Sequence, residues 1–285
     1  MKVLVAGGTG FIGRVLCRIL SRRGHDVTAA GRSPPATMAG AETATLDVTD
    51  SDLIDTVEGH DVVVNLVALP SHVDPAGQSH DAVTRQGTEH LVAASQAAGV
   101  DRFVQMSALG VDSDVETAYF AAKRRAERIV RHSDLDWVIY RPSVVFGDGC
   151  AFLPFLCRLS AARIVPLPGG GQLRIQPIWV DDLGEILSDG VEDDRHTGET
   201  YELGGPDVLT LAETIVLLRP NAVVLSLPME LSALGASVAA YLPGIPIGLD
   251  QHRVQTLDNT VTSNDVAAFG VDERNLHSLY EYLGR

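Results

Sequence analysis

Tyr119 and Lys123 form the pair of residues best suited to acid and base chemistry. They stand four residues apart in the sequence YFAAK, which opens a predicted helix that continues through Val130. Side chains four apart on a helix share one face, so the Lys123 ammonium can lie near the Tyr119 phenol. A nearby cation favours the phenolate and lowers the pKa of a tyrosine from about 10, which helps it exchange a proton with a substrate oxygen. The pair is therefore a candidate general acid and base, with a solvated helix face beside Arg124 as the alternative.

The N-terminal sequence KVLVAGGTGFIG, residues 2–13, combines a short apolar strand with glycines three residues apart. Gly7 permits a sharp turn, Gly10 lets the backbone approach a pyrophosphate, and Gly13 lets the following helix pack closely on its strand. That helix is expected to end at Gly24, and its free N–H groups and dipole would bind the phosphates. An ordinary glycine-rich turn is the alternative. The cofactor contacts predicted in this segment are Gly7, Thr9, Gly10, Phe11, Ile12 and Gly13.

The end of the second predicted strand, Asp26 to Ala30, indicates which dinucleotide binds. Sites that select NAD usually place an acid there to hold the ribose 2′-hydroxyl, whereas this strand is followed by Gly31, Arg32 and Ser33. The planar guanidinium of arginine suits a phosphate group. We therefore expect Arg32 and Ser33 to bind the 2′-phosphate, so that NADP(H) is preferred over NAD(H). The alternative for Arg32 is a solvated loop charge.

The elements that must position these residues alternate between strand and helix. Further strands are predicted at 43–46, 61–68 and 102–106 and within 134–149, with helices through 53–57 and 83–98. This alternation predicts an α/β fold, a Rossmann-type doubly wound parallel sheet with helices on both faces, and ligands bind at the carboxyl ends of its strands. The candidate residues at such ends are those of the glycine segment, Arg32, Asp47, Ala68 and Ser107.

The chain is expected to divide into a dinucleotide-binding domain, residues 1–149, and a small C-terminal substrate lobe, residues 150–285. Residues 173–204 are expected to return to the first domain. The segment 229–242 is nearly uncharged and too short to span a bilayer, so it is predicted to be a core or pocket-lining helix. Its apolar character favours an apolar substrate.

The sequences GGTGFIG and YFAAK resemble those of the short-chain dehydrogenase/reductase superfamily, in its extended or atypical branch. That branch includes NAD(P)-dependent epimerases and dehydratases and the nucleotide-binding accessory subunit of respiratory complex I. The resemblance continues through RPSVVFGDG, LRIQPIWVDDL and GETYELGGPDVLTLAE, and so spans nearly the whole chain. It implies that Tyr119 exchanges a proton with the substrate, and that Lys123 tunes Tyr119 and holds the cofactor ribose.

The same resemblance implies roles for residues outside the two motifs. Asp47, followed by Val48, would approach the adenine amino group, with a helix N-cap as the alternative for Asp47. The loop at Ala68 would pass the cofactor ribose, and the backbone at Pro142 and Ser143 would border the nicotinamide. The family has a Ser or Thr that bonds the substrate oxygen. Ala108 rather than Ser107 aligns with that position, so Ser107 is a candidate only through a shifted loop.

Three functions are compatible with these motifs. The first is hydride transfer between NADP(H) and a carbonyl or carbinol carbon of an apolar or sugar-like small molecule. The second is non-catalytic NADPH binding for a structural or regulatory purpose, which the alanine at position 108 favours. The third is a nucleotide-sugar epimerase or dehydratase.

Composition limits the partners. A formal net charge of -15 argues against nucleic acid, which requires a basic face. The three cysteines have no metal-like spacing, so neither zinc nor disulfides are expected. The sequence has no apolar run of transmembrane length and no signal peptide, so a cytoplasmic protein is expected, with its oligomeric state open. Of 22 lysines and arginines only Lys2 and Lys123 are lysines, which suggests a halophilic protein.

Overall fold

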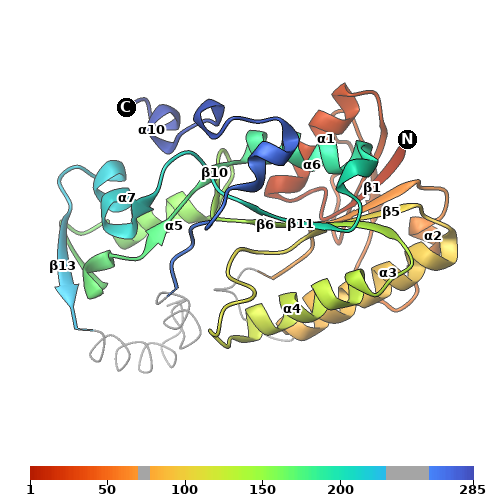
Figure 1. Ribbon diagram of the computed structural model, residues 1–285, viewed down its shortest axis with the longest axis horizontal. Coiled ribbons are helices and arrows are strands. Elements are labelled where there is room, and N and C mark those ends of the chain that lie inside the picture. The colour runs from red at the N-terminus through yellow and green to blue at the C-terminus, as the bar shows by residue number, and fades with distance from the viewer. Residues whose placement is uncertain (70–77, 229–256) are drawn as a thin grey trace.

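A sheet of seven parallel strands forms the centre of the computed structural model, which describes residues 1–69, 78–228 and 257–285 (Figure 1). The strand order is β11-β6-β5-β4-β1-β2-β3. The strands β1 and β4 are nearly continuous apolar runs, as expected for parallel strands that helices cover on both faces. The strands of this sheet are β1 Lys2–Ala6, β2 Asp26–Gly31, β3 Glu42–Thr45, β4 Val62–Asn65, β5 Arg102–Met106, β6 Asp136–Pro142 and β11 Glu199–Leu203.

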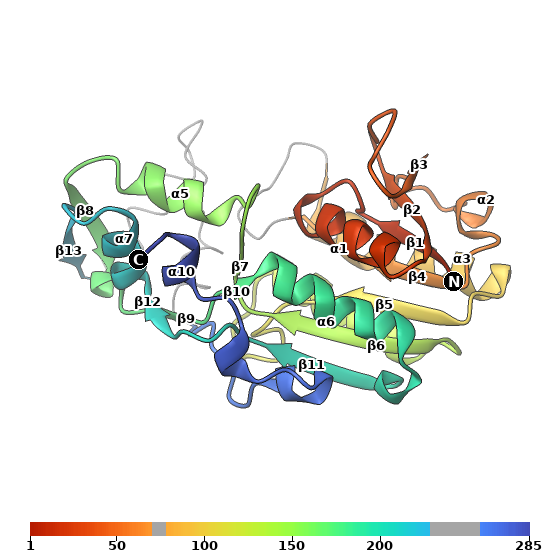
Figure 2. The same cartoon turned by 90° about the horizontal axis from the view of Figure 1, so that it is seen from above.

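Helices α1 and α6 cover one face of the sheet, and α2, α3 and α4 cover the other (Figures 1 and 2). Arg23, at the end of α1, joins the two helices of the first layer, because its guanidinium lies 2.7 Å from Asp189 and 2.8 Å from Glu192 on α6. The bounds of these elements are α1 Phe11–Arg22, α2 Ile54–Val57, the π-helix η1 Asp81–Gln86, α3 Gly87–Ala98, α4 Ala118–Arg131 and α6 Val180–Glu192.

The doubly wound Rossmann-type fold is therefore confirmed. The strand predicted at 102–106 has the same bounds in the structure. The strand predicted at 61–68 is shorter, because the Asn65 side chain accepts a hydrogen bond from the backbone N–H of Val67 and the chain leaves the sheet there. The predicted helix 83–98 is present, but its first part belongs to the π-helix η1, and α3 begins at Gly87. Such π segments often occur at functional sites.

A smaller lobe lies beyond the carboxyl ends of the strands (Figure 2). Helix α7 begins with a capping box, in which Thr210 and Glu213 each bond the other's backbone N–H. The lobe contains β7 Val145–Phe146, α5 Phe152–Leu159, β8 Ile164–Pro168, η2 Gly169–Gly171, β9 Arg174–Ile175, β10 Ile178–Trp179, β12 Leu209–Thr210, α7 Leu211–Leu218, β13 Val223–Leu227 and α10 Leu279–Tyr282. The short helices η3 Asp194–His196, η4 Asp265–Phe269 and η5 Glu273–Asn275 complete the described elements.

The C-terminal helix is only α10, because Ser278 forms a capping box with Glu281 and starts the helix at Leu279. Leu276 and Leu279 are buried as expected of a packing segment, whereas Tyr280 is 40% exposed. The apolar segment 229–242 lies outside the described residues, and the domain division at residue 149 stays a prediction. No helix among the described residues is long and apolar enough to span a bilayer.

Candidate functional site

The glycine segment forms a tight cradle between β1 and α1. Gly7 has φ of +82°, a conformation that favours glycine. A Cβ on Gly13 would lie 2.2 Å from the Gly7 carbonyl oxygen, so only a glycine lets the helix start so close to the turn. No side chain caps the first turn of α1 at Gly10, which leaves backbone N–H groups there for an anion. The cradle therefore fits a pyrophosphate group.

Gly13→Ala should affect the stability of the fold, whereas Gly10→Ala should affect cofactor binding. Gly13→Ala forces backbone apart and should lower the free energy of unfolding by roughly 2–3 kcal/mol, seen as a lower melting temperature. Gly10 has φ of -78°, and its added Cβ would meet only the Gly7 oxygen, at 3.1 Å. Gly10→Ala should therefore keep the wild-type melting temperature but weaken both NADPH and NADH about tenfold. Equal melting temperatures for the two variants would contradict this assignment.

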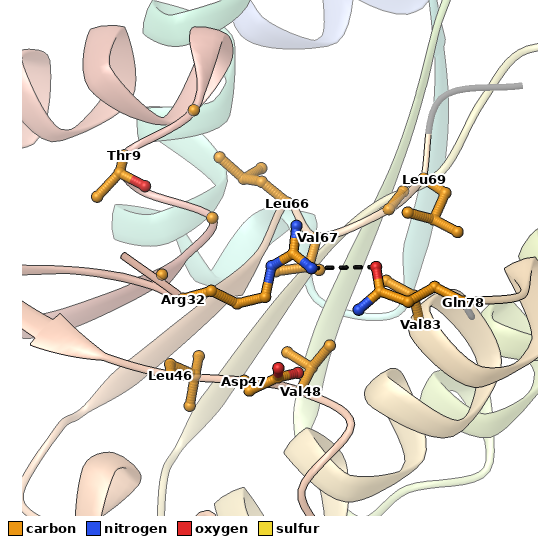
Figure 3. A pocket seen from close by; sticks show the side chains of 14 residues that line it. Thr9, Arg32, Leu46, Asp47, Val48, Leu66, Val67, Leu69, Gln78 and Val83 are labelled. Atoms are coloured by element: carbon orange, nitrogen blue, oxygen red, sulfur yellow. Dashed lines mark hydrogen bonds between the residues drawn. The ribbon is translucent and has the colours of Figure 1, made fainter. Parts of the chain in front are cut away.

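A cavity of about 290 Å³ lies at the carboxyl ends of β1, β2, β3 and β4, where ligands bind in doubly wound sheets (Figure 3). Seven residues predicted as cofactor contacts line it: Gly7, Thr9, Gly10, Arg32, Asp47, Val48 and Ala68. Seven others do not: Phe11, Ile12, Gly13, Ser33, Lys123, Pro142 and Ser143. Seven lining residues were not predicted from the sequence: Gly31, Leu46, Leu66, Val67, Leu69, Gln78 and Val83. The general rule for strand ends could have found Gly31, Leu46, Leu66 and Val67, whereas no sequence signal marks Gln78.

Arg32 projects into this cavity from the end of β2 (Figure 3). Its Nη1 donates a hydrogen bond to Gln78 Oε1 at 3.0 Å. The preceding residue, Gly31, lines the cavity at the strand end, where NAD-selective sites place an acid. A Cβ there would lie 2.7 Å from Thr9 Oγ1, so an acidic side chain at this position would displace Thr9. The end of β2 thus offers a cation and no carboxylate, and an acid at position 31 would require Thr9 to move.

Asp47 lies below Arg32 in the same cavity (Figure 3). Its Oδ1 accepts hydrogen bonds from the Thr49 backbone N–H at 3.0 Å and from the Thr49 hydroxyl at 2.7 Å. These bonds, with a smaller effect from the Arg32 charge, hold the pKa of Asp47 below its usual value. The N-cap alternative for Asp47 is wrong, because Leu53 is the N-cap of α2. Asp47 is therefore an ionised acceptor within the cavity.

Lys123 is buried beside the carboxyl end of β5, with 3% of its surface exposed. Its Nζ donates hydrogen bonds to the carbonyl oxygens of Met106 at 2.9 Å and Ser107 at 3.4 Å, and lies 5.9 Å from the centroid of the Tyr119 ring. Burial lowers the pKa of Lys123 to about 8, against the opposing effect of the Glu127 carboxylate. Thr117 caps α4 and so fixes the turn that carries Tyr119. The structure brings the predicted pair together.

The pKa of Tyr119 shifts in the direction opposite to the one expected from a neighbouring ammonium. Tyr119 as a whole keeps some exposed surface, but burial of its phenol raises its pKa to about 12. The physical reason is that Lys123 directs its ammonium to two backbone carbonyls, which leaves burial as the dominant effect on the phenol. His80 packs edge-on against the Tyr119 ring, with centroids 5.6 Å apart. Without cofactor, Tyr119 is therefore a protonated phenol at neutral pH.

Ser107 follows β5 and is 4% exposed. Its hydroxyl oxygen is buried and has no hydrogen-bond partner within the described part of the chain. Such orphaned hydroxyls are uncommon in folded proteins and are compatible with a ligand contact. The neighbouring Ala108 carries no polar group. Ser143, by contrast, has its hydroxyl 2.7 Å from Asn259 Oδ1, so that side chain is engaged within the lobe.

A buried ion pair supports the helix that carries Tyr119 and Lys123. Glu127, one turn beyond Lys123, is 1% exposed and accepts hydrogen bonds from Arg141 Nε at 2.9 Å and Nη2 at 2.7 Å. Arg131 lies 2.8 Å from the same carboxylate. The sequence analysis did not single out these residues, because the partners come from α4 and β6. The spacing Tyr119, Lys123, Glu127 on one helix face was the available signal.

Together, the seven-stranded sheet, the glycine cradle and the cavity at its strand ends define a dinucleotide-binding protein of the Rossmann type. Residues 7–149 match the family model described as NAD(P)H-binding. The chain is 31% identical to 2-alkyl-3-oxoalkanoate reductase of Stenotrophomonas maltophilia, over 75% of this chain and 74% of the relative. The chain belongs to the NAD(P)-binding short-chain dehydrogenase/reductase superfamily, in its extended branch, as the resemblance implied.

Other relatives extend the similarity over most of the chain. The NADH dehydrogenase [ubiquinone] 1 alpha subcomplex subunit 9 of Arabidopsis thaliana is 27% identical, over 93% of this chain and 70% of that protein. Among solved structures, MoeE5 in complex with UDP-glucuronic acid and NAD matches with a TM-score of 0.68 and 22% identity, over 90% of this chain and 100% of that one. That match shows the fold alone.

Proposed function

We propose that the protein is an NADP(H)-dependent reductase that transfers hydride between the cofactor and a carbonyl or carbinol carbon of a small molecule. The observation that carries the cofactor preference is the end of β2, where Arg32 lines the cavity and a glycine stands in place of an acid. Asp47 supports the same placement of the adenosine half of the cofactor, since its carboxylate can accept a hydrogen bond from the adenine amino group. The glycine cradle would hold the pyrophosphate.

The nicotinamide, when bound, supplies the hydride. Tyr119 would provide the proton to the substrate oxygen, since its raised pKa keeps the phenol protonated. Lys123 would hold the cofactor ribose. Together with the positive charge of an oxidised nicotinamide, its ammonium would favour loss of the Tyr119 proton. Ser107 is a candidate to position the substrate oxygen, because its buried hydroxyl has no partner among the described residues. Pro142 and Ser143 would border the site with their backbone.

An apolar or sugar-like carbonyl compound is the proposed substrate class. The name of the Stenotrophomonas relative describes a ketone with alkyl substituents, which supports the apolar alternative. The solved structure with UDP-glucuronic acid supports the sugar alternative only through its fold. Non-catalytic NADPH binding is the second candidate function. It is supported by Ala108, which lacks the family's hydroxyl, and by the relative that is a subunit of NADH dehydrogenase.

Arg32→Ala tests the cofactor preference by fluorescence titration with NADPH and NADH. The wild-type protein should bind NADPH roughly tenfold or more tightly than NADH, because a guanidinium and a phosphate form charge-assisted hydrogen bonds. Arg32→Ala should remove most of that difference and leave NADH unchanged. Arg22→Ala is the matched control, because Arg22 is an exposed arginine on α1 outside the cavity. A wild-type protein that binds both equally would refute the NADP preference.

We also propose adaptation to high salt, supported by the net charge of -15 and the near absence of lysine. Repulsion among surface carboxylates is screened by salt, so the melting temperature should rise as KCl increases above physiological concentration. Thermal unfolding monitored by circular dichroism across a KCl series measures this. A melting temperature that stays flat or falls would sink the proposal.

A further inference from the structure

The contact between Arg32 and Gln78 connects two separate parts of the cofactor cavity. Arg32 follows β2, whereas Gln78 lies 46 residues later, before η1. The hydrogen bond from Arg32 Nη1 to Gln78 Oε1 crosses the cavity, and both side chains line it (Figure 3). The orientation of the Gln78 amide is fixed by chemistry, since a guanidinium donates hydrogen bonds and accepts none. Gln78 therefore holds the guanidinium through a neutral acceptor.

Arg32 differs from other arginines that bridge distant segments in its lack of a carboxylate partner among the described residues. Arg23 pairs with Asp189 and Arg141 pairs with Glu127. Within the described residues, no carboxylate forms an ion pair with Arg32. Asp47 lies nearby, but its bonds to Thr49 direct one of its oxygens elsewhere. Arg32 thus feels the Asp47 charge without a direct ion pair, and it has further N–H donors for an anion.

An exposed arginine samples many rotamers, and an anion that binds it must pay the entropy of ordering the side chain. A hydrogen bond from the opposite wall of the cavity restricts those rotamers before the anion arrives. A carboxylate in place of the amide would restrict them too, but it would also neutralise the guanidinium and repel a phosphate. The side chain at position 78 therefore controls both the orientation and the available charge of Arg32.

We propose that Gln78 is a second determinant of cofactor selectivity, which orients Arg32 for the 2′-phosphate of NADP(H). This inference rests on the proposed function, because it concerns the same phosphate. Gln78 is a positioning residue that acts through Arg32, and its effect should be confined to ligands that carry the 2′-phosphate. It is neither a contact of the nicotinamide nor a catalytic group.

The test compares dissociation constants of NADPH and NADH for Gln78→Ala and Gln78→Glu at fixed salt. Gln78→Ala should weaken NADPH roughly three- to tenfold, as expected when the binding step must order one long side chain, and leave NADH unchanged. Gln78→Glu should weaken NADPH more, by about tenfold or beyond, since its carboxylate pairs with Arg32 and faces the phosphate. Gln96→Glu, which adds the same charge at an exposed helix position, is the control and should match wild type.

Two further measurements separate the possible failures. In an Arg32→Ala background, Gln78→Ala should cause no additional loss of NADPH affinity, because its effect passes through Arg32. Adenosine 2′,5′-bisphosphate and 5′-AMP, which lack the nicotinamide, should reproduce the difference between NADPH and NADH. If the wild type prefers NADPH but Gln78→Glu keeps that preference, or weakens both cofactors equally, only the role of Gln78 is overturned. If the wild type shows no preference, the proposed function fails and this inference fails with it.

Discussion

Tyr119→Phe should reduce turnover by roughly 10²–10⁴-fold, the range attributed to a general acid or base, and leave folding and NADPH affinity near wild type. The substitution removes the proton and keeps the ring, so the edge-on contact with His80 persists. With a pKa of about 12 without cofactor, the Tyr119 phenol is protonated at neutral pH and so carries the proton that carbonyl reduction requires. Loss of this proton source should therefore lower the rate of the chemical step.

The measurement is NADPH oxidation against a panel of aldehydes, ketones and quinone-like compounds, followed by kcat for the best substrate. Tyr280→Phe is the control, since Tyr280 is exposed in the C-terminal helix, and it should behave as wild type. An active protein whose kcat is indifferent to Tyr119→Phe would overturn the role of Tyr119. A panel without turnover, together with tight NADPH binding, would favour the non-catalytic function.

Glu127→Gln should lower the free energy of unfolding by about 3 kcal/mol, because it leaves the Arg141 guanidinium buried beside a neutral amide. The side chain of Arg141 is only 7% exposed, and Glu127 makes two hydrogen bonds to it. Asp112, 2.6 Å from Arg141, and Glu202, 3.4 Å from it, remain as partners and place the expected loss at the lower end of the range for buried pairs. The melting temperature should fall by roughly 6–12 °C.

Glu89→Gln is the matched control, because Glu89 pairs with Arg85 on the surface and its side chain is 57% exposed. Exposed pairs of this kind contribute about 0.5 kcal/mol or less. Chemical denaturation of both variants measures the difference. Similar losses for Glu127→Gln and Glu89→Gln would show that the Glu127 pair does not stabilise the fold more than a surface pair does.

The fold could be predicted from sequence because its signals are local. An apolar strand, a glycine turn and an amphipathic helix follow one another within residues 2–22, and the strand at 102–106 is an unbroken buried run that ends at Ser107. Since parallel strands share one carboxyl edge, the residues that follow them converge without knowledge of any contact. The rule therefore predicts that Arg32 and Asp47 lie at one edge of the sheet, and both line the cavity there.

The finer features of the site depend on contacts between distant residues, which a single sequence does not show. Gln78 reaches Arg32 across 46 positions. The direction of the Tyr119 pKa depends on where the Lys123 ammonium points, and that ammonium bonds carbonyls at the end of β5. The spacing of four residues correctly predicted that Tyr119 and Lys123 lie together. It does not show whether burial or the nearby charge has the larger effect on the pKa of Tyr119.

A crystal structure of the protein with NADP⁺ bound tests the proposed cofactor site directly. We expect the pyrophosphate on the glycine cradle and the 2′-phosphate about 3 Å from the Arg32 guanidinium, with the Gln78 contact retained. The adenine amino group should face Asp47, and the nicotinamide should lie beside Tyr119. A 2′-phosphate turned to solvent away from Arg32, or a nicotinamide remote from Tyr119, would contradict the proposed site.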